Sequence, residues 1–414
     1  MNFKHNWWDK FRKLWFWPIA KLSLLVLILS TFSLNLFKKI TLEGAYLDGL
    51  LIDYLIPKFY LVDIFLILFL LIEWRFWPKL KKSPGVYLWL SGLFAVQIFT
   101  PRPLAAWHAL LHLCAWWLFF YLMRQDPFWQ RPKVQKLGLL TLLGVIMVQS
   151  CLAIYQFIWQ QPLLAYHFLG ESRLLDLANI SKAQFWWAEK ILPYGSTAHP
   201  NILAGLIVIL SILVLKQNHW QRWLKIALII NLVGIVFITQ SFSALLSGLL
   251  FLLYTYFFSK NSVDKNPSMS QKILLFSLFL GWIVLLPLFL ERSSQKKQFD
   301  SIGRRANLNQ AAWRMWQSKP IFGVGLNQFT YYLEQFATTK ETVRFVQPAH
   351  QLLLLILSEG GLYLFFGLFY LLRRARIAHF LLKSTVLLAI VSLDHYLWTQ
   401  PVGLALLSLF YLFF

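Results

Sequence analysis

The stretch Gln347-Pro348-Ala349-His350-Gln351 stands directly before the apolar run Leu352-Leu353-Leu354-Leu355-Ile356-Leu357. It closes a long polar segment, residues 291–349, in a chain that otherwise alternates between apolar runs and short charged connections. The flanking apolar runs have about the length that crosses a bilayer, roughly 17–25 residues. The pattern therefore predicts a large loop between two membrane helices, and we look for chemistry in this loop and at the helix that follows it.

The composition is that of a membrane protein rather than of a soluble domain. Of the 414 residues, 58% are hydrophobic, 18% are aromatic and only 14% are charged, whereas soluble domains are about 45–50% apolar. We predict an all-α polytopic membrane protein in which residues 1–414 form a single integral membrane domain. The formal net charge of +22 does not indicate nucleic-acid binding, because the basic residues fall in short clusters between the apolar runs.

Eleven or twelve runs are candidate transmembrane helices, and the last of them is short. They lie near 20–37, 59–77, 85–100, 104–123, 136–159, 200–216, 223–238, 240–258, 272–290, 350–372, 380–397 and 402–414. The basic N-terminus precedes the first run, and Leu36-Phe37-Lys38-Lys39 offers no small-residue cleavage site. We therefore expect an uncleaved first helix rather than a signal peptide.

The distribution of basic residues sets the orientation. With the N-terminus inside, 23 of the 39 Lys and Arg residues lie on the inner side, which leaves 16 on the outer side, nine of them in segment 291–349. Without that long loop the count is 23 inside against seven outside, which is a clear positive-inside bias. This orientation places the two long loops, 160–199 and 291–349, on the outer side.

The large outer loop carries three candidate arginines. Residues 301–317 have helical spacing, with Arg304 and Arg305 in the first turns and Arg314 further along. Pro320 and two glycines end this helix, and a second short helix is expected near 327–337. The arginines suit either lipid headgroups and solvation of the loop or a clamp on a diphosphate, since guanidinium binds phosphate oxygens bidentately.

His350 is the candidate base. It stands at the outer end of an inward-running helix, where the positive end of the helix dipole favours a neutral imidazole. A neutral histidine accepts a proton from an attacking hydroxyl. The alternative is an interfacial histidine that serves only as a polar cap.

Two further positions are candidates for binding the substrate. His199-Pro200-Asn201 flanks the start of another inward-running helix, so His199 and Asn201 present either a structural cap or a second helix end for an anion. Glu359 falls well inside the span that begins at His350, and carboxylates within the membrane are functional candidates. Close helix packing at Gly360-Gly361 is the competing explanation for this carboxylate.

The other histidines give weaker signals. His108 and His112 lie four residues apart on one helix, but the sequence supplies too few further ligands for zinc. Asp394 and His395 form a polar pair that suits helix packing. We expect no metal and no cofactor.

Three segments together resemble the O-antigen ligase and polymerase family of bacterial membrane glycosyltransferases. They are residues 194–204, which contain His199-Pro200-Asn201; residues 304–329, which contain Pro320-Ile321-Phe322-Gly323-Val324-Gly325; and residues 347–351 with Ser358-Glu359-Gly360-Gly361-Leu362. Asp394-His395-Tyr396-Leu397-Trp398 also looks like a late segment of some members. The resemblance covers roughly residues 190–400, and the earlier spans match only in hydropathy.

The resemblance implies a C-type glycosyltransferase fold with a large helical outer loop. It also implies metal-free, inverting transfer of a glycan from an undecaprenyl-diphosphate carrier to a glycan, lipid or protein hydroxyl. The reaction would take place on the outer side of the bacterial cytoplasmic membrane, among membrane lipids. By match, His350 corresponds to the family's base, and Arg304 or Arg305 to the loop arginine that contacts the diphosphate.

The sequence departs from the family pattern at two positions. Phe242 stands where the family usually has an arginine, in a turn that reads Thr239-Gln240-Ser241-Phe242-Ser243-Ala244. A phosphate contact is therefore missing there, for which Arg314 or the second of the paired arginines is a candidate substitute. Gln351 stands where asparagine commonly follows the histidine.

Two functional alternatives remain open from sequence. A flippase or exporter of lipid-linked glycans would need polar residues lining a path through many spans, and few ionisable residues beyond Asp63 and Glu359 lie within the predicted spans. Ligase and polymerase use the same donor and differ only in the acceptor, so the sequence does not separate them.

Overall fold

The computed structural model describes most of the chain. The described residues are 17–41, 43–75, 84–164, 169–174, 180–185, 188–217, 220–258, 296–339, 343, 346–374 and 383–414. The span predicted near 272–290 lies outside them.

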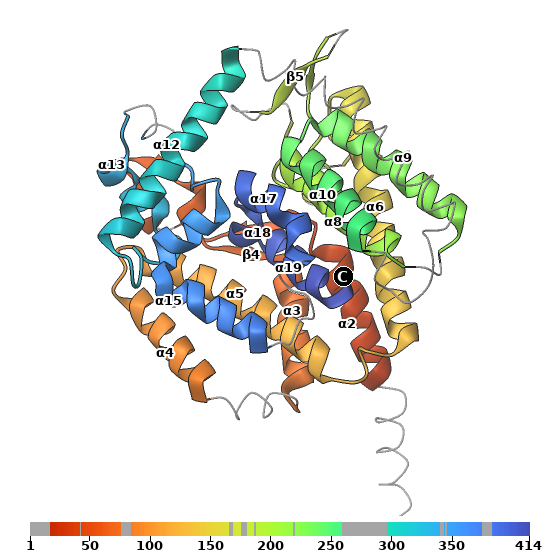
Figure 1. Cartoon of the computed structure of the whole chain (residues 1–414), viewed down its shortest axis with the longest axis horizontal. Helices are drawn as coiled ribbons and strands as arrows, with labels where there is room; N and C mark the ends of the chain where they lie inside the picture. Colours follow the sequence, from red (N-terminus) through yellow and green to blue (C-terminus); the bar gives the residue numbers. More distant parts are fainter. Residues whose placement is uncertain are drawn as a thin grey trace, which may run out of the picture.

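Helices dominate the described residues (Figure 1). They are α2 (Trp17–Thr31), α3 (Leu61–Ile72), α4 (Pro84–Ile98), α5 (Pro103–Gln125), α6 (Pro132–Trp159), α8 (Pro200–Leu215), α9 (Arg222–Thr239), α10 (Phe242–Phe258), α12 (Lys296–Ser318), α13 (Phe329–Phe336), α15 (Leu352–Arg374), α17 (Leu388–Leu393), α18 (Tyr396–Thr399) and α19 (Pro401–Phe413). Within this part of the chain, α5, α6, α9 and residues 352–372 of α15 are long and apolar enough to cross a membrane, and five further apolar helices are shorter. The prediction of an all-α polytopic membrane protein is confirmed, and the total number of spans stays a prediction.

Prolines mark the starts of several helices. Pro103, Pro132, Pro200 and Pro401 each occupy the first turn of a helix, where the missing N–H removes no hydrogen bond and the fixed φ angle suits the helix. These four starts agree with the predicted spans to within a few residues. The predicted helices 301–317 and 327–337 of the large loop correspond to α12 and α13, and Pro320 ends the first of them as expected.

Short strands replace helix at the ends of the first two predicted spans. Helix α2 ends at Thr31, and residues 37–39 form β1 (Phe37–Lys39), which pairs antiparallel with β4 (Lys58–Tyr60). The first predicted span, near 20–37, therefore runs past the end of its helix, whereas the second, near 59–77, begins two residues before α3, and its last residues lie outside the described part of the chain. Two more hairpins are present: β2 (Tyr46–Leu47) with β3 (Leu50–Leu51), and β5 (Lys182–Gln184) with β6 (Glu189–Ile191).

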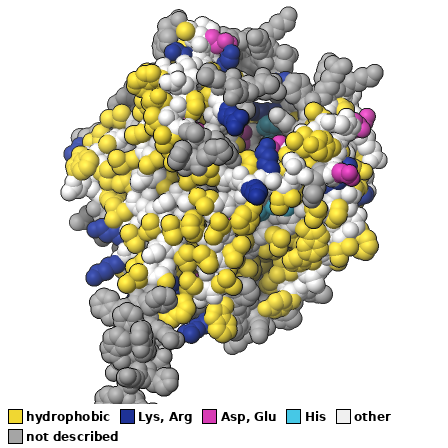
Figure 2. All heavy atoms as spheres, turned by 180° about the vertical axis from the view of Figure 1, so that it is seen from behind, with side chains coloured by type: hydrophobic (Ala, Val, Ile, Leu, Met, Phe, Trp, Pro, Cys, Tyr) yellow, Lys and Arg dark blue, Asp and Glu magenta, His cyan; other side chains and the backbone are white. Residues whose placement is uncertain are grey.

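Helix α8 is the central helix. All of its residues except Asn201 are buried, and it packs against α6, α9, α10 and α19. A helix that is apolar on every side is stable only when other helices surround it. By contrast, α3, α6, α9 and α15 carry large exposed apolar side chains such as Leu71, Met147, Ile230 and Phe366, and Figure 2 shows hydrophobic side chains spread widely over one face. Such faces suit lipid.

Helix α15 is broken at Gly361, and the large loop forms hydrogen bonds with the backbone groups on either side of the break. Gly361 has φ 60° and ψ −165°, which is not helical. The N–H groups of Val324 and Gly325 donate to the carbonyls of Ser358 and Glu359 at 2.8 and 2.9 Å. In return, the N–H groups of Leu362 and Tyr363 donate to the carbonyls of Pro320 and Ile321, both at 2.9 Å. Backbone groups freed by a break in a membrane helix must find such partners.

Two glycines make this close approach possible. A Cβ on Gly323 (φ 66°) would lie 2.4 Å from the carbonyl carbon of Glu359, and one on Gly361 would lie 2.3 Å from the carbonyl oxygen of Ile321. Only glycine fits such contacts at positive φ. The Pro-Ile-Phe-Gly-Val-Gly turn and the Glu-Gly-Gly segment therefore form one structural unit.

The predicted span 380–397 is not a continuous helix. Residues 385–387 form a 3-10 turn and α17 follows, but Asp394 has an extended backbone (φ −142°, ψ 148°) and interrupts the helix. The short α18 then ends at Gln400, whose extended backbone is the conformation favoured before a proline, here Pro401. The prediction was wrong because hydropathy does not register a polar break, and the interruption places Asp394 and His395 beside the site described next.

Candidate functional site

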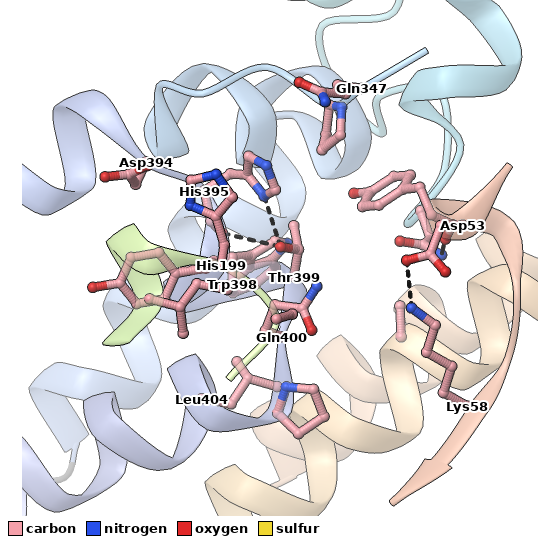
Figure 3. A pocket seen from close by; sticks show the side chains of 18 of the residues that line it. Asp53, Lys58, His199, Gln347, Asp394, His395, Trp398, Thr399, Gln400 and Leu404 are labelled. Carbon is pink, nitrogen blue, oxygen red and sulfur yellow. Dashed lines mark hydrogen bonds and ion pairs between the residues drawn. The ribbon is translucent and has the colours of Figure 1, made fainter. Parts of the chain in front are cut away.

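One cavity of about 360 Å³ gathers most of the polar residues singled out by sequence. Its lining comes from the 53–60 segment, α5, the start of α8, α12, the segment before α15 and residues 394–404. In Figure 3, Asp53 and Lys58 lie across the open space from His199, His395 and Thr399. Figure 2 shows histidine side chains near a hollow with lysine and arginine side chains around it. We call the side that contains Arg305, His199, His350 and His395 the Arg305 wall. The opposite side, which contains Asp53 and Lys58, is the Asp53 wall.

Arg305 is placed by the register of α12. Leu308, Ala312 and Met315 are buried against α15, and Arg305 precedes them on the same helical stripe at spacings of three and four residues. Its side chain lines the cavity, and no ion pair joins it to any of the described residues. A guanidinium without a carboxylate partner is well suited to an anionic ligand.

His350 lies at the mouth of α15 and faces the same cavity. Burial lowers the pKa of His350 to about 2, helped by the neighbouring His395, Arg305 and His199, although the carbonyl of Pro348 opposes the change. Nδ1 is buried without a hydrogen-bond partner among the described residues, and the side chain lines the cavity. A neutral imidazole at this place is able to accept a proton.

His395 stands directly beside His350. The two ring centroids are 5.1 Å apart and the rings are nearly perpendicular, at 82°. His395 Nδ1 is 2.8 Å from the hydroxyl of Thr399, which fixes the orientation of the ring. Burial lowers the pKa of His395 to about 3, together with the charges of His199 and Arg305.

Asp394 connects three separate segments behind the histidines. Asn201 donates its amide N–H to Asp394 Oδ1 at 3.3 Å, and Ser243 donates its hydroxyl to Oδ2. Burial raises the pKa of Asp394, while Arg305 and these two hydrogen bonds act in the opposite direction. The carboxylate therefore joins the starts of α8 and α10 to the α17–α18 break.

His199 forms the cap that the sequence offered as one alternative, and it also lines the cavity. Its Nδ1 accepts the backbone N–H of Asn201 at 3.1 Å, and its Nε2 lies 3.2 Å from the hydroxyl of Ser181. Desolvation by the surrounding cavity walls lowers the pKa of His199 to about 4, with a contribution from Arg305, although the side chain is partly exposed. The Arg305 wall thus combines one cation with three neutral imidazoles at pH 7.

The Asp53 wall pairs a carboxylate with a lysine. Lys58 Nζ lies 2.5 Å from Asp53 Oδ2, and Lys39 Nζ lies 3.6 Å from Oδ1. Burial alone would raise the pKa of Asp53, but the two lysines lower it below its ordinary value. Burial, and to a smaller extent Lys39, lowers the pKa of Lys58, while its contact with Asp53 acts in the opposite direction.

His108 and His112, behind this wall, have structural partners. His108 Nε2 lies 2.8 Å from the carbonyl of Lys58, and His112 Nε2 lies 3.1 Å from each carboxylate oxygen of Asp63. No three His, Cys, Asp or Glu side chains in the described part of the chain form a group suited to a metal ion.

Glu359 lines the cavity from within α15, and it also holds the surrounding segments together. Its Oε1 accepts the hydroxyl of Tyr54 and the N–H of Phe329, both at 3.0 Å. Its Oε2 is buried and has no hydrogen-bond partner among the described residues. Glu359 therefore ties the 53–60 segment and the start of α13 to the broken helix.

Three residues weighed in the sequence lie away from the cavity lining. Arg304 is half-buried on α12, Arg314 is exposed on the same helix, and neither lines the cavity. Phe242, in the place of the family's turn arginine, begins α10 with 44% of its surface exposed. The geometry therefore singles out Arg305, and it does not support Arg314 as a replacement for the missing turn arginine.

Sequence reasoning missed Asp53 and Lys58 and treated Asp394 and His395 only as a packing pair. Two signals were present: a carboxylate and a lysine in a short connection between two predicted spans, and an Asp-His pair that interrupts an apolar run seven residues before Pro401. Neither signal specifies which side chains converge across the fold.

Comparison with known proteins gives one family match. Residues 192–372 match the family model described as O-antigen ligase. This match supports an assignment of the chain to the O-antigen ligase family. The matched O-antigen ligase region contains Arg305, His350, His199 and Glu359, whereas Asp394, His395 and the Asp53 wall lie outside it. A search of curated protein sequences gave no match. The family and the apolar helices indicate a glycosyltransferase-like enzyme of a bacterial membrane.

Proposed function

We propose that this protein transfers a glycan from an undecaprenyl-diphosphate carrier to an acceptor hydroxyl on the outer side of the cytoplasmic membrane. The reaction is inverting and needs no metal. The observation that carries the proposal is the convergence of an unpaired guanidinium, Arg305, and a neutral imidazole, His350, on one cavity. These are the two groups that a diphosphate leaving group and an attacking hydroxyl require.

In the transfer step, the acceptor oxygen attacks the anomeric carbon of the donor sugar. The bond between that carbon and the diphosphate oxygen breaks, and its electron pair stays with the diphosphate. His350 takes the proton of the acceptor hydroxyl, and Arg305 stabilises the charge that builds on the leaving group. The proton later passes from His350 to water.

Arg305 acts on the donor with no direct ion pair to a described residue, and the neutral state of the histidines leaves it as the main cation of the site. Three protonated imidazoles would bind diphosphate tightly before and after reaction, whereas neutral rings leave the guanidinium as the main electrostatic partner. Asp394 and His395 position the site from behind through Asn201, Ser243 and Thr399.

The test supplies purified full-length protein with undecaprenyl-diphosphate glycan and several acceptors, and examines the products. Wild-type protein is expected to form a new glycosidic bond, and His350→Ala is expected to reduce the rate at least 100-fold while remaining in the membrane. A ladder of product lengths identifies a polymerase, and a single shift identifies a ligase. Wild-type turnover by His350→Ala would contradict the role of this residue.

A flippase or exporter is the alternative, and the same protein in liposomes distinguishes it. Movement of lipid-linked glycan across the bilayer, with no new glycosidic bond from any acceptor, would favour transport. The described spans argue against this alternative, because the buried ionisable groups near the cavity are engaged in local hydrogen bonds rather than lining a path across the helices.

A further inference from the structure

We propose that the Asp53 wall is the acceptor subsite and that it binds a sugar through at least two of the sugar's hydroxyl groups. The inference rests on the proposed function and names the chemical class of the acceptor. It assigns a role to a part of the chain outside the region that matches the family.

The Asp53 wall is built to receive hydroxyl groups. The side chain of Asp53 is 65% exposed, whereas that of its partner Lys58 is only 10% exposed. The carboxylate therefore keeps open acceptor positions toward the cavity while the lysine fixes its orientation. Carboxylates that are held in this way accept charge-assisted hydrogen bonds, which are shorter and stronger than neutral ones.

The position of Lys58 is itself fixed. Its backbone N–H and carbonyl both face His108 Nε2, at 3.1 and 2.8 Å, and the residue belongs to β4, which pairs with β1. A ligand therefore meets a preorganised pair and does not have to order it, which lowers the entropic cost of binding.

Charge separates the two substrates between the walls. Arg305 forms no ion pair with the described residues and is open to a diphosphate, whereas Lys58 and Lys39 are already engaged with Asp53, so we place the donor's diphosphate on the Arg305 wall. A neutral polyol is not repelled by Asp53 and donates hydrogen bonds to it. The cavity volume of about 360 Å³ lies within the range of small-molecule sites, about 300–1,000 Å³.

A second observation points to a ligand with several hydroxyl groups. Glu359 lines the cavity, is only 1% exposed, and has a buried Oε2 with no hydrogen-bond partner among the described residues. Unsatisfied buried acceptors are rare and call for a partner. A sugar supplies one hydroxyl for attack and others for Asp53 and Glu359. A serine side chain supplies only the first.

The first arm of the test measures binding without turnover. Full-length protein in detergent is examined by saturation-transfer NMR with the methyl glycosides of glucose, galactose and N-acetylglucosamine. Wild-type protein and Arg305→Ala are expected to give a signal with at least one glycoside, and Asp53→Asn is expected to lose it. Equal signals from wild type and Asp53→Asn overturn the proposal, as does binding of a serine peptide with no glycoside bound.

The second arm measures transfer with a saccharide acceptor. Asp53→Asn is expected to raise the acceptor KM about 10- to 100-fold, the effect of losing a hydrogen bond to a charged group, and to leave the donor KM within about twofold. Asp48→Asn is the matched control. Asp48 is an exposed aspartate in the same region that does not line the cavity, and its φ of 48° is one that asparagine tolerates.

The outcomes separate this inference from the proposed function. If wild-type protein transfers glycan and Asp53→Asn keeps the wild-type acceptor KM, the acceptor subsite is wrong and the proposed function stands. If wild-type protein transfers nothing, the proposed function fails, and the NMR arm still decides whether the wall binds sugar. Asp53→Glu, which retains the charge, is expected to recover part of the acceptor affinity and replaces Asp53→Asn if that variant does not fold.

Discussion

The imidazole rings of His350 and His395 meet edge to face, with centroids 5.1 Å apart. Each ring makes protonation of the other less favourable, because two cations in a buried site repel one another. The relationship joins a residue from the mouth of α15 with one from the break between α17 and α18, and no apolar pattern in the sequence connects these positions. It makes the pH dependence of the reaction a direct test of the site.

We expect transfer to persist well below the ordinary pKa of histidine. The pKa of His350 is lowered from 6.5 to about 2, first by burial and then by His395 and Arg305, so the neutral base form is retained as the pH falls through 6.5. The acid limb of kcat/KM, which reports the free enzyme, should therefore lie below pH 5.

The measurement is a pH profile of kcat/KM for wild-type protein and for His395→Gln. Removal of the second imidazole should move the acid limb upward, toward 6.5, because one of the causes of the lowered pKa is then absent. An acid limb centred near pH 6.5 in wild-type protein would contradict the assignment of His350 as a buried, neutral base.

Arg305 should dominate over the other two loop arginines. Arg305→Ala is expected to reduce kcat about 10²- to 10³-fold, the effect of removing one electrostatic contact to the transition state. Arg305→Lys should recover only part of the rate, since an ammonium group lacks the bidentate geometry. Arg314→Ala, which changes an exposed residue of the same helix outside the cavity, is the matched control and should stay within about twofold of wild type. Steady-state kinetics decide the point, and equal losses at Arg305 and Arg314 would favour a general role in lipid binding.

The helices were predictable because each depends on local signals. Each signal spans only neighbouring residues in the sequence: an apolar run of bilayer length, a proline at a helix start, or the Pro-Gly break after Ser318. The sequence also predicted a helix in the large loop that carries the arginines, although it did not distinguish Arg304 from Arg305 as the cavity residue. That choice depends on which side of α12 packs on α15.

The remainder of the site depends on contacts between distant segments. Asp394 is held by Asn201 and Ser243, from the starts of two other helices, and these hydrogen bonds offset the burial of a carboxylate within an apolar run. Asp53 lies in the 3-10 turn Asp53–Leu55, and its partner Lys58 belongs to β4, which pairs with β1. Strands of three residues carry almost no periodic signal, so the sequence pattern could not predict the Asp53 wall.

The contact between Gly323 and Glu359 predicts a sharp difference between two glycines of the large loop. Gly323→Ala places a Cβ 2.4 Å from the backbone of Glu359 at a φ of 66°, and it should destabilise the protein by about 2 kcal/mol or more. Gly303→Ala is the control, because Gly303 lies in α12 with no atom within 4 Å of the added Cβ, and alanine favours a helix. Thermal unfolding in detergent should show a lowered midpoint for the first variant only. If both variants unfold like wild type, the loop is not locked to α15 as described.

The hydrogen bond between Tyr54 and Glu359 should couple the Asp53 wall to the large loop. Tyr54→Phe removes a donor 3.0 Å from Glu359 Oε1 and is expected to cost about 0.5–1.5 kcal/mol, the net contribution of a typical hydrogen bond within a protein. Tyr331→Phe is the matched control, since the hydroxyl of Tyr331 forms no hydrogen bond with the described residues although its ring contacts Arg102. Because Tyr54 lies next to Asp53, the same variant should also raise the acceptor KM.

A double-mutant cycle separates this contact from other effects of the substitution. In a Glu359→Leu background residue 359 offers no acceptor to the Tyr54 hydroxyl, so the contact under test is absent. Tyr54→Phe should then cost measurably less than it does in wild-type protein, so the cycle gives a nonzero coupling energy. The free energies come from reversible unfolding in detergent at one pH. Strict additivity of the two substitutions would mean that Tyr54 and Glu359 act independently, and the link between the N-terminal wall and the broken helix would then have to run through other contacts.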